Sequence, residues 1–384
     1  MTTLLQPAFP FVSVVIDTSA LLPVAQRAPG VVAVVGLADD TAATPANTPV
    51  VVTDHDSVMA AFGKGTDPTT LTQSLDLVLQ QDPMPSKVYG VRTDSTKNYG
   101  AALSSLEAAD DVTFVCLAAE YNVGTGGGTP TNLRALLAHV EQMSAAGNKR
   151  IAVAAIDPTV AKSGTYATAQ LTAYANVMSD DGRMVLVAAR GADADPAAAA
   201  MGAIAGYSPS TSVVLKQVRG FHMPVTGQFS PAEIGALAGA GVIPVIDPAL
   251  IPGTGLYFGD GGTFTSDATR SYVDIVRVLD DIEFRLRAGL IGTVGASRIT
   301  KAGLTSIRMR VEGILGPLQR AAVIDDFSVQ IPVLDILSIP ESARSAADTA
   351  TVVTARSTRQ VDVLLSITYG PAVHRLNVTL APKF

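Results

Sequence analysis

The sequence predicts an α/β protein in which helices flank a mostly parallel sheet, followed by an α+β C-terminal domain with extended strand arms at both chain ends. Three observations lead to this prediction. Short apolar segments alternate with helical segments between about residues 85 and 250. Long amphipathic segments and alternating strand patterns follow residue 266, and strand-like segments near both ends are set off by proline or glycine. Regular alternation of strand and helix indicates a parallel sheet covered by helices.

The apolar segments have the length and composition of strands that are buried on both faces. The first follows a turn at residues 27–30 and reads VVAVVG. Continuous short apolar runs are typical of parallel strands, because helices cover both sides of such a sheet. The expected strands are residues 31–36, 86–91, 112–118, 151–156, 184–188 and 242–246.

Helical periodicity fills the intervals between these strands. Five apolar residues from Leu133 to Met143 recur at helical spacing, and Gly147 ends that segment. Ser230-Pro231 opens a second helix near residues 233–240. Between 192 and 203 the chain is rich in alanine, and this is the one compositionally biased stretch.

The pattern changes after the glycine-dense residues 252–264, which predict a hairpin or turn region. A long amphipathic helix is expected after Ser266-Asp267, which are suitable N-cap residues. A second helix is expected over 304–322, and strands over 327–336 and 360–369. We therefore place the domains at 21–265 and 266–371.

Both chain ends carry strand-like segments outside these domains. Residues 1–20 form an N-terminal arm, and 372–384 form a C-terminal arm beyond the break at Gly370-Pro371. A terminal strand whose alternating apolar face is not covered within its own molecule requires the edge of another sheet. We expect the arms to pair with neighbouring copies through Phe11, Val12, Val14 and Ile16 at one end and Leu376, Val378 and Leu380 at the other.

Composition excludes several classes of function. The net charge is −7, whereas a nucleic-acid binder needs a basic face. The single cysteine, Cys116, lies in an apolar run, which excludes a disulfide framework and favours a buried thiol over a nucleophile. The N-terminus has no signal-peptide pattern, and no apolar run has the roughly 20 residues of a membrane helix. The sequence thus predicts a protein of a reducing cytoplasm, or one released without secretion.

Motifs for catalysis or cofactor binding are incomplete. The loop Gly124-Thr125-Gly126-Gly127-Gly128 has neither the third glycine of a dinucleotide site, because residue 129 is Thr129, nor the lysine of a P-loop. The four histidines have no metal-ligand spacing, and Asp54-His55-Asp56 has the character of a helix cap. Asp157-Pro158 and Asp247-Pro248 end strands, where either a catalytic carboxylate or an Asp-Pro turn would fit. We expect no catalytic residues, metal or cofactor.

Basic residues are densest where the second C-terminal helix begins. This group comprises Arg298, Lys301, Arg308 and Arg310, on roughly one helix face. A solvated helix face and an electrostatic contact with an acidic neighbour remain equally open.

Several segments, taken in order, resemble the tail sheath proteins of contractile phages and related injection systems. Residues 27–37 resemble the family's entry strand, and 52–63 (VTDHDSVMAAFG) its segment ending in Phe-Gly. Further similar segments are 201–207 (MGAIAGY), 240–244, the glycine turn 253–255 and the helix 272–283. The chain departs from the family in being short and in lacking tryptophan, since Leu256-Tyr257-Phe258 stand where the family often has one.

This resemblance implies a structural protein and not an enzyme. It implies an outer domain at 21–265, an inner domain at 266–371 that faces the tail tube, and arms that join copies into stacked, hexameric rings of a helical sheath. Arg298, Lys301, Arg308 and Arg310 would face the tube. The implied partners are the tube protein, baseplate and tail terminator, with no direct nucleic-acid contact and no membrane insertion, in a virion tail assembled in the host bacterial cytoplasm.

Two alternatives remain open at this point. One is an α/β nucleotide- or sugar-binding enzyme with the loop at 124–129 as its phosphate site. The other is a baseplate or tube component, although tube subunits are usually smaller and rich in β-structure.

Overall fold

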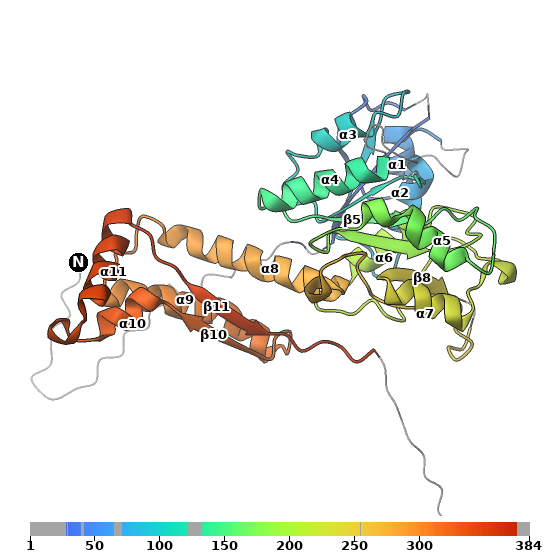
Figure 1. Cartoon of the computed structure of the whole chain (residues 1–384). Coiled ribbons are helices and arrows are strands. Elements are labelled where there is room, and N and C mark those ends of the chain that lie inside the picture. The colour runs from blue at the N-terminus through green and yellow to red at the C-terminus, as the bar shows by residue number, and fades with distance from the viewer. Residues whose placement is uncertain are drawn as a thin grey trace, which may run out of the picture. The chain divides into compact units, whose positions relative to one another are not determined.

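The structure is a computed structural model that describes residues 28, 30–39, 42–64, 71–121, 132–253 and 255–374. The described residues form two compact units (Figure 1). The larger unit extends to Glu283 and includes residues 371–374, and the smaller unit is Phe284–Gly370. The division falls inside a helix, whereas the sequence analysis placed a boundary between 265 and 266.

A nine-stranded, mostly parallel sheet forms the centre of the larger unit, as the sequence predicted. The six middle strands are mutually parallel, and antiparallel strands lie at both edges. In spatial order the strands are β2 (Val50–Val52), β3 (Lys87–Arg92), β1 (Val31–Gly36), β4 (Phe114–Leu117), β5 (Ile151–Ala155), β6 (Met184–Ala188), β8 (Val242–Ile246), β9 (Leu256–Phe258) and β7 (Gln217–Val218).

Every residue of β1, β4, β5 and β6 is buried, which explains their unbroken apolar sequences. The helices that cover the sheet are α1 (His55–Phe62), α2 (Leu71–Leu79), α3 (Tyr99–Ser105), α4 (Asn132–Ala145), α5 (Tyr166–Ala173), α6 (Pro196–Gly206) and α7 (Pro231–Gly239). Helices α2 and α6 pack against each other, as do α3 and α4, and α5 and α7.

The alanine-rich stretch forms α6, whose small residues permit close packing. All but one of its residues are buried. A Cβ atom at Gly202 would come within 3.0 Å of the backbone of Val78 in α2, so the two helices approach more closely than a larger residue allows. The small residues of α6 are therefore required for its close packing against α2.

Helix α8 (Val273–Leu290) begins later than expected. The Asp267 side chain accepts a hydrogen bond from Thr269 N and caps a short 3₁₀ turn, Ala268–Arg270. The α-helix starts only after that turn. Its residues up to Glu283 belong to the larger unit, where Val273, Val276 and Ile282 are buried.

The smaller unit contains α9 (Lys301–Arg320), β10 (Asp326–Gln330), α10 (Pro332–Ser338), α11 (Ala346–Thr358) and β11 (Leu364–Thr368). The expected strand over 327–336 is wrong beyond Gln330. Pro332, which has no N–H for a strand ladder, stands in the first turn of α10 instead. Helix α11 was not predicted; Ser345 and Asp348 form the capping box that begins it. Its buried residues Val352 and Ala355 join the core of this unit.

Candidate assembly surface

The smaller unit presents a two-stranded antiparallel ribbon made of β10 and β11 (Figure 1). Phe327 lies opposite Ile367, and Val329 opposite Leu365. Among the described residues each strand has one partner, so each leaves one edge of its backbone unpaired. An unpaired edge presents N–H and C=O groups to which a further strand can bind.

A groove of about 650 Å³ runs along β10. Four consecutive residues, Phe327 to Gln330, line it together with Arg308 and Glu312 from α9 and Asp335 from α10. Successive strand residues point to opposite faces, so a groove that touches all four lies along the strand edge. The unpaired edge of β10 is therefore accessible, with charged side chains of both signs beside it.

The four basic residues singled out in the sequence do not share one face. Arg308 Nε lies 2.9 Å from Glu312 Oε1, one helical turn along. Arg310 lies on another side of α9, because two residues advance a helix by about 200°. Lys301 is the first residue of α9, Arg298 lies in the preceding loop, and all four side chains are exposed.

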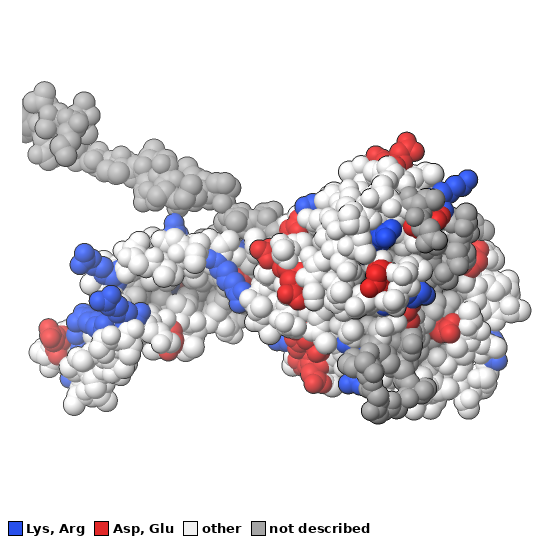
Figure 2. Space-filling view, turned by 90° about the horizontal axis from the view of Figure 1, so that it is seen from above, with Lys and Arg blue, Asp and Glu red and all other residues white. Residues whose placement is uncertain are grey.

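Charge is distributed unevenly along the chain. Residues 284–370 contain ten Lys and Arg against seven Asp and Glu, a net charge of +3, whereas the whole chain carries −7. Figure 2 shows blue side chains grouped on the surface that the smaller unit forms. A positive surface on a negative protein attracts an acidic partner through long-range electrostatics.

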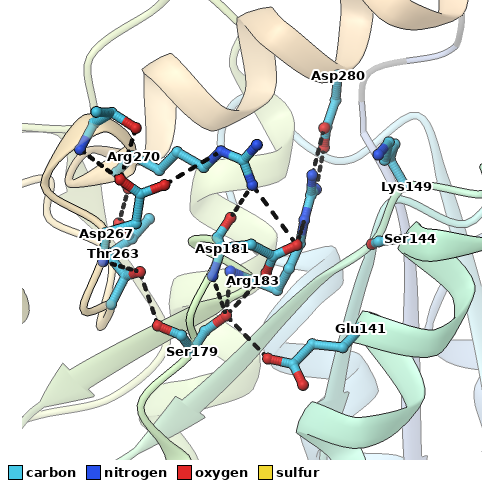
Figure 3. A network of polar contacts seen from close by, with 12 residues as sticks. Glu141, Ser144, Lys149, Ser179, Asp181, Arg183, Thr263, Asp267, Arg270 and Asp280 are labelled. Atoms are coloured by element: carbon cyan, nitrogen blue, oxygen red, sulfur yellow. Dashed lines mark hydrogen bonds and ion pairs between the residues drawn. The ribbon is translucent and has the colours of Figure 1, made fainter.

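Ion pairs hold the first half of α8 to the larger unit (Figure 3). The guanidinium of Arg183 makes a bidentate contact with Asp280, at 2.6 Å and 2.9 Å. Burial alone would lower the pKa of Arg183, but the hydrogen bonds and charge interactions with Asp280 and Asp181 together outweigh that effect and raise the pKa. Lys149 Nζ lies 3.1 Å from Glu283 Oε2, which adds a contact at the end of this half.

A buried arginine of α8 also caps another helix. Arg277 donates to the carbonyl oxygens of Ile204, Tyr207 and Ser208, where α6 ends. Burial lowers the pKa of Arg277 to about 10, which leaves it charged at neutral pH. A positive charge is favourable at a helix C-terminus, where carbonyl groups lack partners.

Two carboxylates on the segments that follow parallel strands, Asp157 and Asp195, make structural contacts. Asp157 Oδ1 accepts hydrogen bonds from Thr159 N and Oγ1, which favours the Asp-Pro turn over a catalytic role. Asp195 is buried and accepts from Ser74 Oγ and from backbone N–H groups of α6 and Ala119. Asp247 is exposed.

The other candidate groups also have structural partners. Asp54 caps α1, as predicted, and His55 contacts Asp76. Cys116 is fully buried, and burial raises the pKa of its thiol. Over the described ranges, no group of three His, Cys, Asp or Glu side chains is arranged to hold a metal ion. None of the described helices is long and apolar enough to cross a bilayer.

The arm residues Phe11, Val12, Val14, Ile16, Leu376, Val378 and Leu380 and the glycine loop at 124–128 lie outside the described residues. The described part of the C-terminal arm ends at His374. The Nε2 atom of His374 lies 2.8 Å from Ser212 Oγ, and the imidazole ring packs edge-on against Tyr272.

Several solved structures of sheath proteins have a similar fold. The sheath of the contracted extracellular contractile injection system PVC has a TM-score of 0.67 and 14% identity, covering 98% of each chain. The contracted helical sheath of the anti-feeding prophage has a TM-score of 0.65 and 12% identity, covering 98% of this chain and 99% of that one. The sheath tail protein of Desulfitobacterium hafniense has a TM-score of 0.56 and 12% identity, over 84% and 93%.

No family model and no curated protein matches the sequence. The structural similarities nevertheless show that the chain has the fold of contractile sheath proteins, so the resemblance found in the sequence motifs is confirmed at the level of fold. The sequence analysis missed the groove along β10, because it extended that strand through Pro332.

Proposed function

We propose that this chain is the structural subunit of a contractile tail sheath, in a phage tail or a phage-derived injection system. The main support is the extent of the structural similarity, which covers 98% of this chain and at least 98% of two sheath chains. A similarity confined to the α/β unit would fit many functions, but this one includes the smaller unit as well.

Copies of the chain would be joined by exchange of terminal strands. The ribbon of β10 and β11 has the unpaired edges that added strands need. The N-terminal arm would contribute Phe11, Val12, Val14 and Ile16, and the C-terminal arm Leu376, Val378 and Leu380. Stacked hexameric rings would thereby become one helical polymer.

The smaller, positive unit would face an acidic tail tube, with the larger unit outside it. Contraction would be a rearrangement of near-rigid units that drives the tube through the host envelope. The free energy would come from new contacts between subunits and would require no nucleotide. The baseplate and the tail terminator would bind the two ends of the sheath. The sheath would assemble in the host bacterial cytoplasm as part of the virion tail.

Removal of residues 372–384 tests the proposal directly. We expect folded monomers that form no long cylinders in negative-stain electron micrographs, whereas the intact protein forms striated hollow cylinders. Serine at Leu376, Val378 and Leu380 should have the same effect, because those side chains set the strand register. Serine at Arg375, Asn377 and Thr379, on the other strand face, is the matched control and should leave assembly intact. Normal cylinders from the truncated chain would refute strand exchange.

A further inference from the structure

His374 attaches the C-terminal arm to the larger unit of its own copy. Residues 370–373 are exposed, and the side chain of Val373 is 80% exposed. At His374 the chain becomes half-buried, and residues 371–374 belong to the larger unit although β11 belongs to the smaller one. One side chain therefore marks the point where this exposed segment meets a packed surface.

The imidazole contacts segments of the larger unit that are distant from one another in sequence. The Nε2 atom lies 2.8 Å from Ser212 Oγ, and the ring meets the Tyr272 ring edge-on, with centroids 5.0 Å apart and planes at 78°. Aromatic rings prefer edge-on or offset arrangements to face-to-face stacking. A Cβ atom at Gly261 would lie 4.0 Å from His374 Cε1, so the ring also lies beside that part of the backbone.

The two residues that contact the imidazole lie in segments held by backbone hydrogen bonds. Leu215, three residues after Ser212, donates from its N–H to the carbonyl oxygen of Phe258 in β9. Tyr272 forms a β-bridge with Gly262 directly before α8 begins. Because both segments are tied to the sheet or to its adjoining turn, the contact site is a fixed point on the larger unit.

The contact shortens the tether of the arm. Leu376 is the first of the arm side chains expected to set the strand register, and it is two residues beyond His374 but eight beyond Thr368, where β11 ends. An extended chain spans about 3.5 Å per residue, so Leu376 can lie up to about 7 Å from a fixed His374 and about 28 Å from Thr368. A shorter tether confines the arm to a smaller volume, which raises its effective concentration at an acceptor strand within reach.

We propose that His374 is the positioning residue for exchange of the C-terminal arm. Its contacts with Ser212 and Tyr272 fix, on the larger unit, the point from which the arm crosses to a neighbouring copy. This inference rests on the proposed sheath function, which brings copies together. The arm would then connect the larger unit of one copy with the ribbon of β10 and β11 of another, so both units of the subunit would be tied into the polymer.

Pulsed electron paramagnetic resonance measures whether His374 holds this segment. Spin labels are attached at Ala372→Cys and Leu250→Cys, which replace exposed residues, whereas Cys116 is fully buried and does not react. The labels are placed in the full-length variant that has serine at the three register residues of the arm, so that they report on monomers. We expect one narrow distribution of label-to-label distances, because His374 fixes residue 372 relative to the larger unit.

Substitutions at the contact should alter this distribution in a graded way. His374→Ala should broaden it most, and Ser212→Ala should broaden it less, because the edge-on contact with Tyr272 remains. His374→Phe, which keeps the ring but loses the hydrogen bond, should resemble Ser212→Ala. Val373→Ala is the matched control, since it changes an exposed side chain one residue away. Thermal unfolding of each variant establishes that it is folded. A distribution that His374→Ala leaves unchanged would overturn the inference.

Assembly of the chain with an intact arm tests the positioning role itself. His374→Ala should raise, several-fold, the protein concentration at which cylinders appear, with His374→Phe intermediate and Val373→Ala unchanged. A broadened distance distribution with no change in that concentration would show a contact without a role in assembly, and would also overturn the inference. The sheath function would stand in both cases, because what overturns it is failure of the unmodified protein to form cylinders.

Discussion

His139 and Arg150 form a buried pair in which only one member is charged. Arg150 is fully buried and donates to the carbonyl oxygens of Leu106 and Ala109. Its Nη1 atom lies 2.8 Å from His139 Nε2, which accepts the hydrogen bond only while the imidazole is neutral. Burial, with a smaller contribution from the arginine charge, lowers the pKa of His139 to about 4.

This pair predicts a loss of stability in acid. Between a pKa of 6.5 for the unfolded chain and about 4 for the folded protein, the unfolded state binds more protons at His139. Stability should therefore fall as pH falls through that window, by at most about 3 kcal/mol, and should be unaffected by this residue above it. Urea unfolding at pH 7 and pH 4.5 measures the change.

His139→Gln is the control for this prediction, because glutamine keeps an acceptor but does not titrate in this range. The variant should lose less stability between the two pH values than the unmodified protein. An identical pH dependence would show that His139 makes no contribution.

Single residues were predictable from sequence where local chemistry decides their role. Asp54 precedes a helix and caps it, and Cys116 lies in an apolar strand and is buried. The arginines were not predictable in this way. Arg150, Arg183 and Arg277 are buried because partners distant in sequence satisfy them, and no local pattern reveals those partners.

At the scale of elements, α8 depends on the ion pair between Arg183 and Asp280. The side chains are 4% and 14% exposed, so the pair is largely removed from water. Asp280→Asn should lower the free energy of unfolding by about 3–5 kcal/mol, because it leaves the buried arginine without its bidentate carboxylate. Denaturant unfolding of the assembly-deficient truncated chain measures the loss.

Replacement of both partners provides the control. Arg183→Met combined with Asp280→Leu should restore much of the stability, since no buried charge then remains uncompensated. If the single substitution changes stability by less than about 1 kcal/mol, the ion pair does not hold α8 in place.

Helices and strands with an unbroken apolar pattern in the sequence were predicted well. Those in which polar residues or proline interrupt the apolar pattern were not. Strands β6 and β8 have the predicted bounds, because a buried parallel strand has an unambiguous apolar sequence. Strand β10 and helix α10 form one apolar stretch in the sequence, interrupted by Pro332. Helix α11 has only two buried residues, Val352 and Ala355, so its apolar periodicity is weak. Its capping box at Ser345 was the one local signal for it.

At the scale of the whole molecule, the separation of charge indicates how copies would orient. The smaller unit carries +3 within a chain of −7, which leaves −10 for the remainder. An acidic tube would attract one part of the subunit and repel the rest, so charge alone would favour one orientation.

Charge reversal tests this orientation. Arg308→Glu and Arg310→Glu should each weaken co-sedimentation with the tube several-fold without lowering the temperature of unfolding, and the loss should diminish at high salt. Because the two residues lie on different sides of α9, an effect of only one would identify the side that faces the tube. Arg320→Glu, with the same change in charge at the end of α9, is the control. Equal binding by all variants would contradict a tube-facing role.

The continuity of α8 through residue 283 limits how the protein can be divided in the laboratory. A fragment that begins at residue 266 would expose Val273, Val276 and Ile282 and separate Asp280 and Glu283 from their partners. A fragment that ends at residue 265 would leave Arg183 without Asp280 and Lys149 without Glu283. Recombination between related genes would meet the same obstacle, so exchange of the smaller unit alone requires a junction beyond Glu283.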